Sequence, residues 1–416
     1  SRYDDSVWRV SRFDERPAGP ATEHPEPLRR ARGYAPYPVK LPFRSAEILA
    51  VGPELKNTFC LARDEYAFVS QHIGDMENLE TLEHFEATLR LYQGLFRLRP
   101  AFVIADMHPD YRTTGYAREL AGRSGARLLE PAQHHQAHVA SCLADNGWPP
   151  DAGAVIGVAL DGTGSGEDGQ IWGGEWFVGD YAGLRRRAHL EYLPLPGGEA
   201  AIRRPWRIAA AYLYRLLGRE ALPGDLGPAD EMRLLLQQID RGLHAPLTSS
   251  MGRLFDAVSA LLGVCRETSY EAQAAIELEQ AARRPAERAA AYPFGLEAGE
   301  NDLLRIRLAP LFGALLEERR SGEPAPAIAW RFHRTVAEMI LQVCRRLREE
   351  TGLSVVALSG GCFQSRLLIE MAVPLLEKEG LRVLLHRQVP CNDGGISLGQ
   401  AALAHFRIAP TEGGGG

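Results

Sequence analysis

The 416-residue sequence predicts an α/β protein built from two halves of similar construction. Short apolar runs typical of buried strands alternate with stretches whose apolar residues recur at helical spacing. Glycine-containing turns follow a strand near residue 47 and again near residue 154, so the second half resembles the first. Strands that alternate with helices and end in polar, glycine-rich turns indicate that ligand sites lie at those turns.

The first half is expected to follow a basic, proline-rich arm. Residues 1–45 contain seven prolines, and each proline biases the residue before it out of the α region, so we expect an extended arm without a helix. The first half then covers residues 46–153. Its expected elements are a hairpin around GPELKN, a helix over 76–96, a strand over 100–111, a helix at YARELAGRSG, a strand at ARLLEP and a helix at the histidine-rich stretch.

The second half is expected over residues 154–408. It opens with a strand, a glycine-rich turn and further strands, in AVIGVALDGTGSGEDGQIWGGEWFVGD. Residues from about 200 to 325 show mostly helical spacing and are interpreted as a helical insertion. A long helix over 327–350 then leads into two strand–turn–helix units. Residues 409–416 have the composition of a flexible tail or linker.

Composition excludes several classes of protein. Hydrophobic residues make up 45% and charged residues 24%, as in soluble globular proteins. The net charge of −6 argues against nucleic acid as a partner. Apolar runs fall well short of the ~20 residues of a membrane span, and the first residues do not resemble a signal peptide. The six cysteines form no CxxC pair, so we expect a cytoplasmic protein with reduced thiols.

Three histidines lie close together in EPAQHHQAH. His134 and His138 are four residues apart, so on a helix they lie about 40° apart on one face, whereas His135 points about 100° away. Two neutral imidazoles at this spacing can share a divalent metal. The same spacing also suits polar residues on an ordinary helix. A metallopeptidase is excluded, because HHQAH lacks the glutamate base of HExxH.

Three strand-end segments carry further candidate groups. Asp161 ends a buried strand in ALDGTGSGEDG, where glycines allow backbone amides to approach a phosphate or simply form a tight turn. Residues 359–361 of ALSGGCFQSR follow a strand and open a helix, which favours an anion or nucleotide. Asp393 in VPCNDGG either caps a helix or supplies a second carboxylate.

Together these groups predict more than each does alone. Two histidines with Asp161 and Asp393 would form a mixed nitrogen–oxygen site suited to Fe(II), Zn(II) or Mn(II). Phosphate-binding loops beside it would place that metal next to a nucleotide. Metal and backbone amides together can stabilise the charge of an acyl phosphate.

Long motifs give the chain a specific resemblance. QHHQAH, IGVALDGTGSGEDGQIWGGEW, RPWRIA, TSSMGRLFDAVSALLG, LSGGCFQSRLL and VPCNDGGISLGQAALA resemble the C-terminal half of the HypF family, and ELKNTFCL, HIGD and MHPDY match too. The resemblance runs from about residue 27 to 406. HypF proteins are the carbamoyltransferases of nickel–iron hydrogenase maturation. The resemblance implies a Kae1-like domain with the two-lobed actin/hexokinase/Hsp70-like (ASKHA) fold.

The resemblance also implies a reaction and its residues. Carbamoyl-adenylate, derived from carbamoyl phosphate and ATP, would give its carbamoyl group to the C-terminal cysteine of the partner protein HypE, for making the cyanide ligands of the active-site iron. A base or positive field near the thiolate would come from His135 or Lys56. The implied ligands of a metal, iron or zinc in the first place, are His134, His138, Asp161 and Asp393. The implied nucleotide contacts are Gly162, Thr163, Gly164, Ser359, Gly360 and Gly361 at the phosphates, and Asp256 and Glu271 at the adenosine end.

The sequence also departs from the HypF pattern. Residues 1–45 resemble only the tail of the YrdC-like domain that makes carbamoyl-adenylate, and the zinc-finger cysteine pairs are absent, so adenylate synthesis by this chain alone is not implied. Ala272 stands where the family has glycine, and Ser365 where it has asparagine. Two alternatives on the same fold are a small-molecule O-carbamoyltransferase and a sugar-type kinase, although a kinase would lack the HxxxH ligands. A third alternative is a non-catalytic scaffold that docks HypE.

Overall fold

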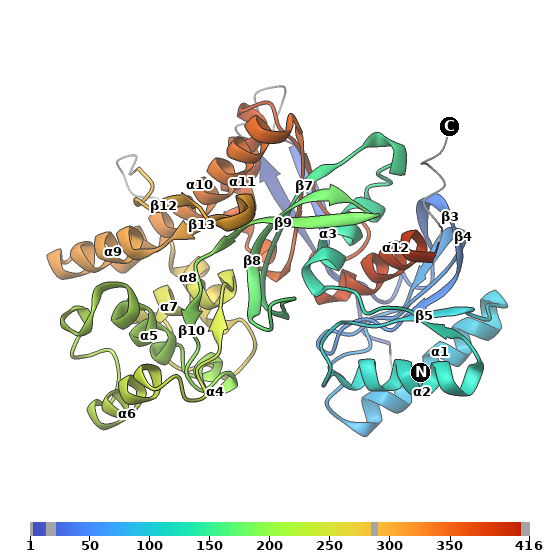
Figure 1. Ribbon diagram of the computed structural model, residues 1–416, viewed down its shortest axis with the longest axis horizontal. Coiled ribbons are helices and arrows are strands. Elements are labelled where there is room, and N and C mark those ends of the chain that lie inside the picture. The colour runs from blue at the N-terminus through green and yellow to red at the C-terminus, as the bar shows by residue number, and fades with distance from the viewer. Residues whose placement is uncertain (1–2, 14–21, 284–289, 409–416) are drawn as a thin grey trace.

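The computed structural model describes residues 3–13, 22–283 and 290–408, and it confirms the predicted two-lobed α/β fold (Figure 1). The tail predicted over 409–416 lies outside the described residues. In the part of the chain that is described, no helix is both long and apolar enough to cross a membrane.

The first lobe is built on a four-stranded sheet in the order β4-β3-β5-β6. The predicted hairpin is confirmed, because β3 and β4 pair antiparallel, and β5 and β6 add parallel strands. Helices α1 and α2 pack on one face of this sheet, where Leu49, Phe85 and Tyr116 share a core. The bounds are β3 (Val39–Ala50), β4 (Cys60–Val69), α1 (Leu79–Phe96), β5 (Phe102–Ile104), α2 (Arg112–Ser124) and β6 (Arg127–Leu128).

The second lobe repeats this pattern within a larger sheet, which runs β12-β13-β9-β8-β7-β14-β15 with β10 and β11 at its side. Here β7 and β8 pair antiparallel, and β14 and β15 continue parallel to β7, as β5 and β6 continue from β3. The predicted similarity of the two halves is therefore confirmed. The strands are β7 (Val155–Ser165), β8 (Ile171–Asp180), β9 (Gly183–Leu190), β10 (Leu193–Pro194), β11 (Leu247–Thr248), β12 (Gly295–Ala298), β13 (Leu304–Arg307), β14 (Val355–Ser359) and β15 (Arg382–Leu384).

Most of the segment read as a helical insertion is helical. The exceptions are the two-residue strand β11 and the pair β12 and β13. The pair β12 and β13 extends the sheet because β13 pairs in parallel with β9. These two strands are only four residues each, too short for a clear alternating pattern. The helices of the second lobe are α4 (Glu199–Arg203), α5 (Pro205–Leu217), α6 (Ala229–Asp240), α7 (Met251–Leu261), α8 (Gln273–Ala281), α9 (Ala309–Ser321), α10 (Ala325–Thr351) and α11 (Arg366–Lys378).

Two helices join the lobes. Helix α3 (His134–Asp145) follows the first sheet but packs on β7 and β14 of the second, whereas α12 (Ile396–Ile408) packs on β3 and β4 of the first. The two helices also pack on each other, and they lie between the sheets in Figure 1. A Cβ at Gly399 would lie 1.8 Å from the carbonyl oxygen of Ala137, so only glycine allows this crossing. Both helices begin at the junction of the lobes.

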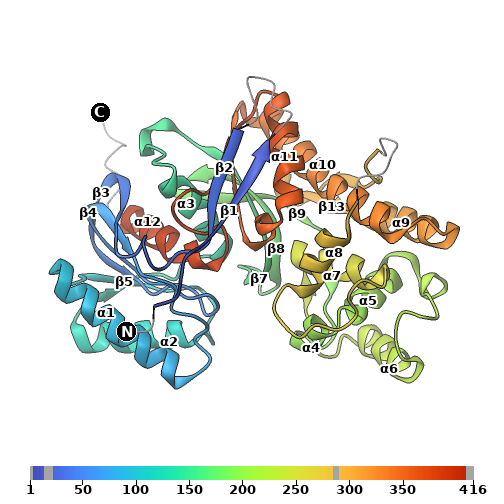
Figure 2. The same cartoon turned by 180° about the vertical axis from the view of Figure 1, so that it is seen from behind.

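The N-terminal arm is more ordered than its proline content indicates. β1 (Val7–Phe13) and β2 (Thr22–Arg29) form an antiparallel pair beside α11 (Figure 2). The amide of Asn392 donates to the carbonyl of Leu28, which ties the arm to the loop before Asp393. The first sheet begins at Val39, within the segment predicted as an arm. Prolines at a two-stranded edge cost few ladder hydrogen bonds, which explains the difference.

A buried histidine in α10 predicts acid sensitivity of the fold. His333 is fully buried, and burial lowers its pKa to about 4. In the unfolded chain the imidazole of His333 takes up a proton near pH 6.5, whereas in the folded chain it stays neutral down to about pH 4. The stability present above about pH 7 is therefore lost as the pH falls. When the pH falls from about 7.5 to 5.5, both proteins should become less stable. The free energy of unfolding should fall by about 1.4 kcal/mol less in the His333→Gln variant than in the wild type. Urea unfolding at both pH values measures this; equal losses would contradict it.

Candidate metal and nucleotide site

Four side chains that are distant in the sequence meet at the junction of the lobes. His134 and His138 come from the first turns of α3, Asp161 from β7, and Asp393 from the short turn before α12. Oδ2 of Asp161 lies 3.4 Å from Nε2 of each histidine. Oδ1 of Asp393 lies 3.8 Å from the same two atoms. One ligand atom from each residue falls within 4.8 Å of all the others.

The residues fit a divalent metal. Nε2 of His134 and Nε2 of His138 are buried and have no hydrogen-bond partner, although both point toward the two carboxylates. Buried polar atoms are rarely left without a partner. Two imidazole nitrogens and two carboxylate oxygens are a donor set that zinc and iron accept. Asp393 does not cap the following turn, because the side chain of Asn392 accepts the amide of Gly394 there.

Asp106 orients His134 from behind. Its Oδ2 lies 2.7 Å from Nδ1 of His134, and both side chains are buried. An N–H at Nδ1 donating to this carboxylate leaves the Nε2 lone pair free for a metal. Burial lowers the pKa of His134, but Asp106 and then Asp161 and Asp393 outweigh it and raise the pKa well above its ordinary value. Asp106 was not predicted, although it follows the strand in PAFVIAD as Asp161 ends the strand in VIGVALD.

A different chain of groups orients His138. Nδ1 of His138 lies 3.4 Å from the hydroxyl of Ser359, which also lies 2.8 Å from Nε2 of His386. Asp145 lies 3.6 Å from the other nitrogen of His386. Ser359 is fully buried, and its hydroxyl faces the rings of His138 and His386.

The Asp106→Ala variant should weaken metal binding. Without the carboxylate, His134 loses its orientation and its Nδ1 proton loses its acceptor, so we expect a loss of roughly 10- to 100-fold in zinc affinity. Asp110→Asn is a matched control, because Asp110 is an exposed carboxylate in the same loop. Competition with a chelating dye measures the affinity of each variant for zinc. Equal affinities for the Ala variant and the wild type would contradict the assigned role.

His135 lies beside the site but outside the ligand set. It is fully buried, and its Nδ1 lies 3.2 Å from the side-chain nitrogen of Gln133. The amide of Gln133 is oriented by Gln136 N, which donates to its oxygen, and by the Ser165 carbonyl, which accepts from its nitrogen. Burial lowers the pKa of His135 well below its ordinary value. A neutral ring whose Nδ1 already accepts a hydrogen bond supplies neither a positive field nor a free base at that nitrogen.

The first glycine segment belongs to a strand rather than a turn. Residues 162–164 lie at the irregular end of β7, and the tight turn follows at 166–169. A Cβ at Gly164 would lie 2.5 Å from Cε1 of His135 and 2.9 Å from Cδ2 of His134. Thr163, between Gly162 and Gly164, is half-buried. Glycine at 164 is therefore required so that the strand can lie against the histidines.

The second glycine segment, Gly360 and Gly361, lies directly against β7. Gly360 has φ +106°, and a Cβ there would lie 2.2 Å from the carbonyl oxygen of Leu160. The amide of Gly361 donates to Oδ1 of Asp161 at 3.0 Å. One carboxylate thus faces both the histidines and this loop. Helix α11 does not begin at the glycines as predicted, because a turn of 3-10 helix over Gly361–Gln364 intervenes.

The two residues predicted at the adenosine end lie in different settings. Asp256 of α7 is buried and accepts from Nε of Arg253 at 2.7 Å. Glu271 is exposed in the loop before α8 and forms an ion pair with Lys56 of the first lobe. Burial opposes the charge of Lys56, but Asp393 and Glu271 outweigh it and raise its pKa. Lys56 is therefore a cation between the lobes and near the carboxylates.

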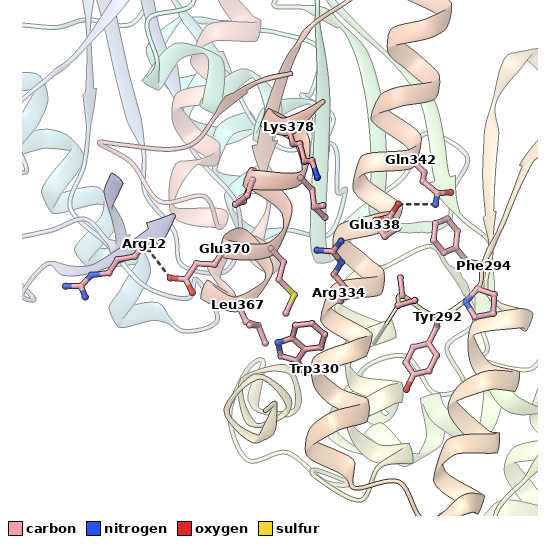
Figure 3. A pocket seen from close by; sticks show the side chains of 16 residues that line it. Arg12, Tyr292, Phe294, Trp330, Arg334, Glu338, Gln342, Leu367, Glu370 and Lys378 are labelled. Atoms are coloured by element: carbon pink, nitrogen blue, oxygen red, sulfur yellow. Dashed lines mark hydrogen bonds between the residues drawn. The ribbon is translucent and has the colours of Figure 1, made fainter. Parts of the chain in front are cut away.

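A cavity lies away from this site. A hollow of about 930 Å³ lies between α10 and α11, where Trp330 and Arg334 face Leu367 and Glu370 (Figure 3). None of the predicted site residues lines it. The site at the junction is thus defined by its converging side chains rather than by the size of a cavity.

Comparison with known proteins explains this arrangement. Two family models match, a HypF Kae1-like domain over residues 44–145 and a carbamoyltransferase Kae1-like domain, second subdomain, over residues 157–400. The chain belongs to the HypF family. Carbamoyltransferase HypF of Rhodobacter capsulatus is 40% identical over 411 residues, which cover 98% of this chain and 52% of the relative. A carbamoyltransferase HypF homolog of Cupriavidus necator is 37% identical over 86% of this chain and 91% of its own length.

Solved structures give the same family. A full-length HypF in a phosphate- and nucleotide-bound form superimposes with a TM-score of 0.89 at 38% identity, covering 99% of this chain and 62% of that one. The chain spans about half the length of most curated HypF relatives it matches, including those of R. capsulatus and C. necator HypF2. The two family matches extend from the first sheet, at residue 44, into α12, at residue 400.

Proposed function

We propose that this chain transfers a carbamoyl group from carbamoyl-adenylate to the C-terminal cysteine of HypE, as part of making the cyanide ligands of the hydrogenase iron. The observation that carries the proposal is the meeting of His134, His138, Asp161 and Asp393 beside the two glycine segments. Family membership supports the carbamoyl chemistry, and the nucleotide-bound HypF relative supports a nucleotide as one substrate.

A divalent metal held by the four ligands would act as a Lewis acid that neutralises phosphate charge. The other groups are the chain's own. Asp106 and Ser359 keep the two histidine rings oriented. Gly162 and Gly361 leave room for phosphate oxygens near backbone amides, once the Gly361 amide turns from Asp161 to the ligand. Glu271 is proposed to bind the ribose of the nucleotide, because an exposed carboxylate can accept hydrogen bonds from the ribose hydroxyls.

The transfer step itself balances without a redox partner. The cysteine thiol of HypE first loses its proton to solvent, and the thiolate attacks the carbamoyl carbon. A C–S bond forms as the bond between that carbon and the phosphate oxygen breaks, and AMP leaves with the bonding electrons. Lys56 supplies the positive field for the incoming thiolate, which fits its place between the lobes. His135, being neutral, is proposed to support the ligand helix by packing against Gly164.

We also propose a source for the adenylate and a cellular compartment for the chain. Synthesis of carbamoyl-adenylate is assigned to a YrdC-like domain, of which the residues before Val39 are proposed to be the tail. The six cysteines are unpaired, in keeping with the reducing cytoplasm that we propose for this protein.

One assay tests the function. The chain is incubated with HypE and either preformed carbamoyl-adenylate or ATP with carbamoyl phosphate, and AMP release and carbamoyl-HypE are measured. We expect product with the adenylate, and none with ATP and carbamoyl phosphate unless a YrdC-like protein is added. Carbamoylation of small hydroxyl compounds in preference to HypE would indicate an O-carbamoyltransferase instead. Binding of HypE without turnover would indicate a scaffold.

A further inference from the structure

Arg253 is a buried cation at the edge of the proposed nucleotide site. It lies in the first turn of α7, which is capped by the Ser250 hydroxyl accepting the Arg253 amide. Its side chain is only 8% exposed. Nε donates to Oδ2 of Asp256 at 2.7 Å, and Nη1 lies 3.4 Å from the carbonyl oxygen of Gly162. The guanidinium is thus held at its Nε side, with its tip toward β7.

On the side of β7, the residue that faces this tip is a glycine. A Cβ at Gly162 would lie 3.9 Å from both Nη1 and Nη2, so the bare glycine faces the guanidinium tip. Gly252 lets α7 approach this closely, because a Cβ there would lie 2.8 Å from Cα of Gly162. Ser250 fixes the contact by donating to the carbonyls of Asp161 and Gly162. The start of a helix, with its partial positive charge, therefore lies directly against the proposed phosphate segment.

The guanidinium also has unused hydrogen-bonding capacity. Arginine carries five N–H donors, and a carboxylate and a long contact to one carbonyl use few of them. Within the described residues, Nη2 has no hydrogen-bond acceptor. Arginine held in a fixed fork binds phosphate oxygens through two parallel hydrogen bonds. Asp256, which was predicted to contact adenosine, is buried behind Arg253 and can act only through it.

We propose that Arg253 binds the phosphate of the adenylate and that Asp256 is the positioning residue that aims it. This rests on the proposed function, since the phosphate is that of carbamoyl-adenylate and of the AMP product. Arg253 comes from the second lobe, whereas Lys56, which is near Asp393 and Asp161, comes from the first. The chemical selectivity follows: a nucleoside monophosphate gains affinity through its phosphate, so it binds more tightly than the nucleoside alone.

Calorimetric titration with AMP and with adenosine, on zinc-loaded protein, tests this. The wild type should bind AMP more tightly than adenosine. In Arg253→Gln, AMP affinity should fall by roughly 10- to 100-fold while adenosine affinity is unchanged, because one charged fork is lost. Arg253→Lys keeps the charge without the fork and should lose less. Arg215→Gln, a change at an exposed arginine of α5, should bind both ligands as the wild type does.

Four results would overturn the proposal. Equal losses for AMP and adenosine in Arg253→Gln would show that the residue only supports the fold. Loss of bound zinc from that variant would show that it supports the metal ligands instead. Unchanged AMP affinity in both variants would show that the phosphate lies elsewhere. A wild type that binds neither AMP nor adenosine would remove the nucleotide site of the proposed function itself, and Arg253 with it.

Discussion

Asp161→Ala is expected to abolish both metal binding and carbamoyl transfer. Asp161 Oδ2 lies 3.4 Å from both ligand nitrogens, and its Oδ1 accepts the Gly361 amide, so this single carboxylate connects the histidines to the second glycine loop. Removing it takes away one ligand and leaves two buried histidines facing Asp393 alone. We expect transfer to fall on the order of 10³-fold or more, which corresponds to about 4 kcal/mol of lost charge stabilisation.

Two further variants make this result specific. Asp161→Asn can still accept the Gly361 amide but has lost the negative charge, so it should lose metal while it retains most of the wild-type stability. Asp151→Asn changes an exposed carboxylate just before β7 and should behave as the wild type. Metal analysis and transfer from supplied carbamoyl-adenylate measure these effects. Wild-type transfer by the Ala variant would show that the four residues are not the reaction centre.

Gly399→Ala should have the largest effect on the fold. The added Cβ would lie 1.8 Å from the Ala137 carbonyl oxygen and 2.9 Å from the Ser141 amide, both in α3. Backbone cannot give way as a flexible side chain would, so α3 and α12 must separate. Helix α3 carries His134 and His138, and α12 directly follows Asp393. The two histidines would therefore move away from Asp393. We expect a loss of about 3 kcal/mol or more in stability, together with weaker metal binding.

The control for this variant is Gly94→Ala. Gly94 lies inside α1 on the surface, and a Cβ there meets nothing within 4 Å. Alanine favours a helix over glycine, so this variant should be more stable by about 0.5–1 kcal/mol. Thermal unfolding of both variants measures the difference. If both variants were equally stable, the close crossing of α3 and α12 would not be a determinant of the fold.

The sequence contained the site in the form of local patterns. The spacing of His134 and His138 and the carboxylate of Asp161 suggested a shared site, because strand ends and helix starts converge in α/β folds. The resemblance to the HypF family then implied the set of four ligands. The same rule predicts Asp106 as well, because it follows β5 and Asp161 lies where the regular pairing of β7 with β8 ends.

Other features depend on contacts that no local pattern encodes. Ser359 follows a strand and precedes glycines, yet its hydroxyl faces His138 and His386 because β14 lies beside α3. Asp256 is turned inward by Arg253, three residues before it on the same helix, and only the burial of that face shows this. Side-chain direction at the end of a strand is decided by tertiary packing, which spacing alone does not reveal.

The proposed reaction is the transfer of a carbamoyl group to a thiol at the four-residue site. Its most direct test is the intact mass of HypE after incubation with this chain, zinc and carbamoyl-adenylate. We predict a gain of one carbamoyl group per HypE, on the C-terminal cysteine, with one AMP released for each, and no gain for HypE carrying a C-terminal Cys-to-Ser change. An equal gain with the Asp161→Ala variant, or no gain with the zinc-loaded wild type, would contradict the claim.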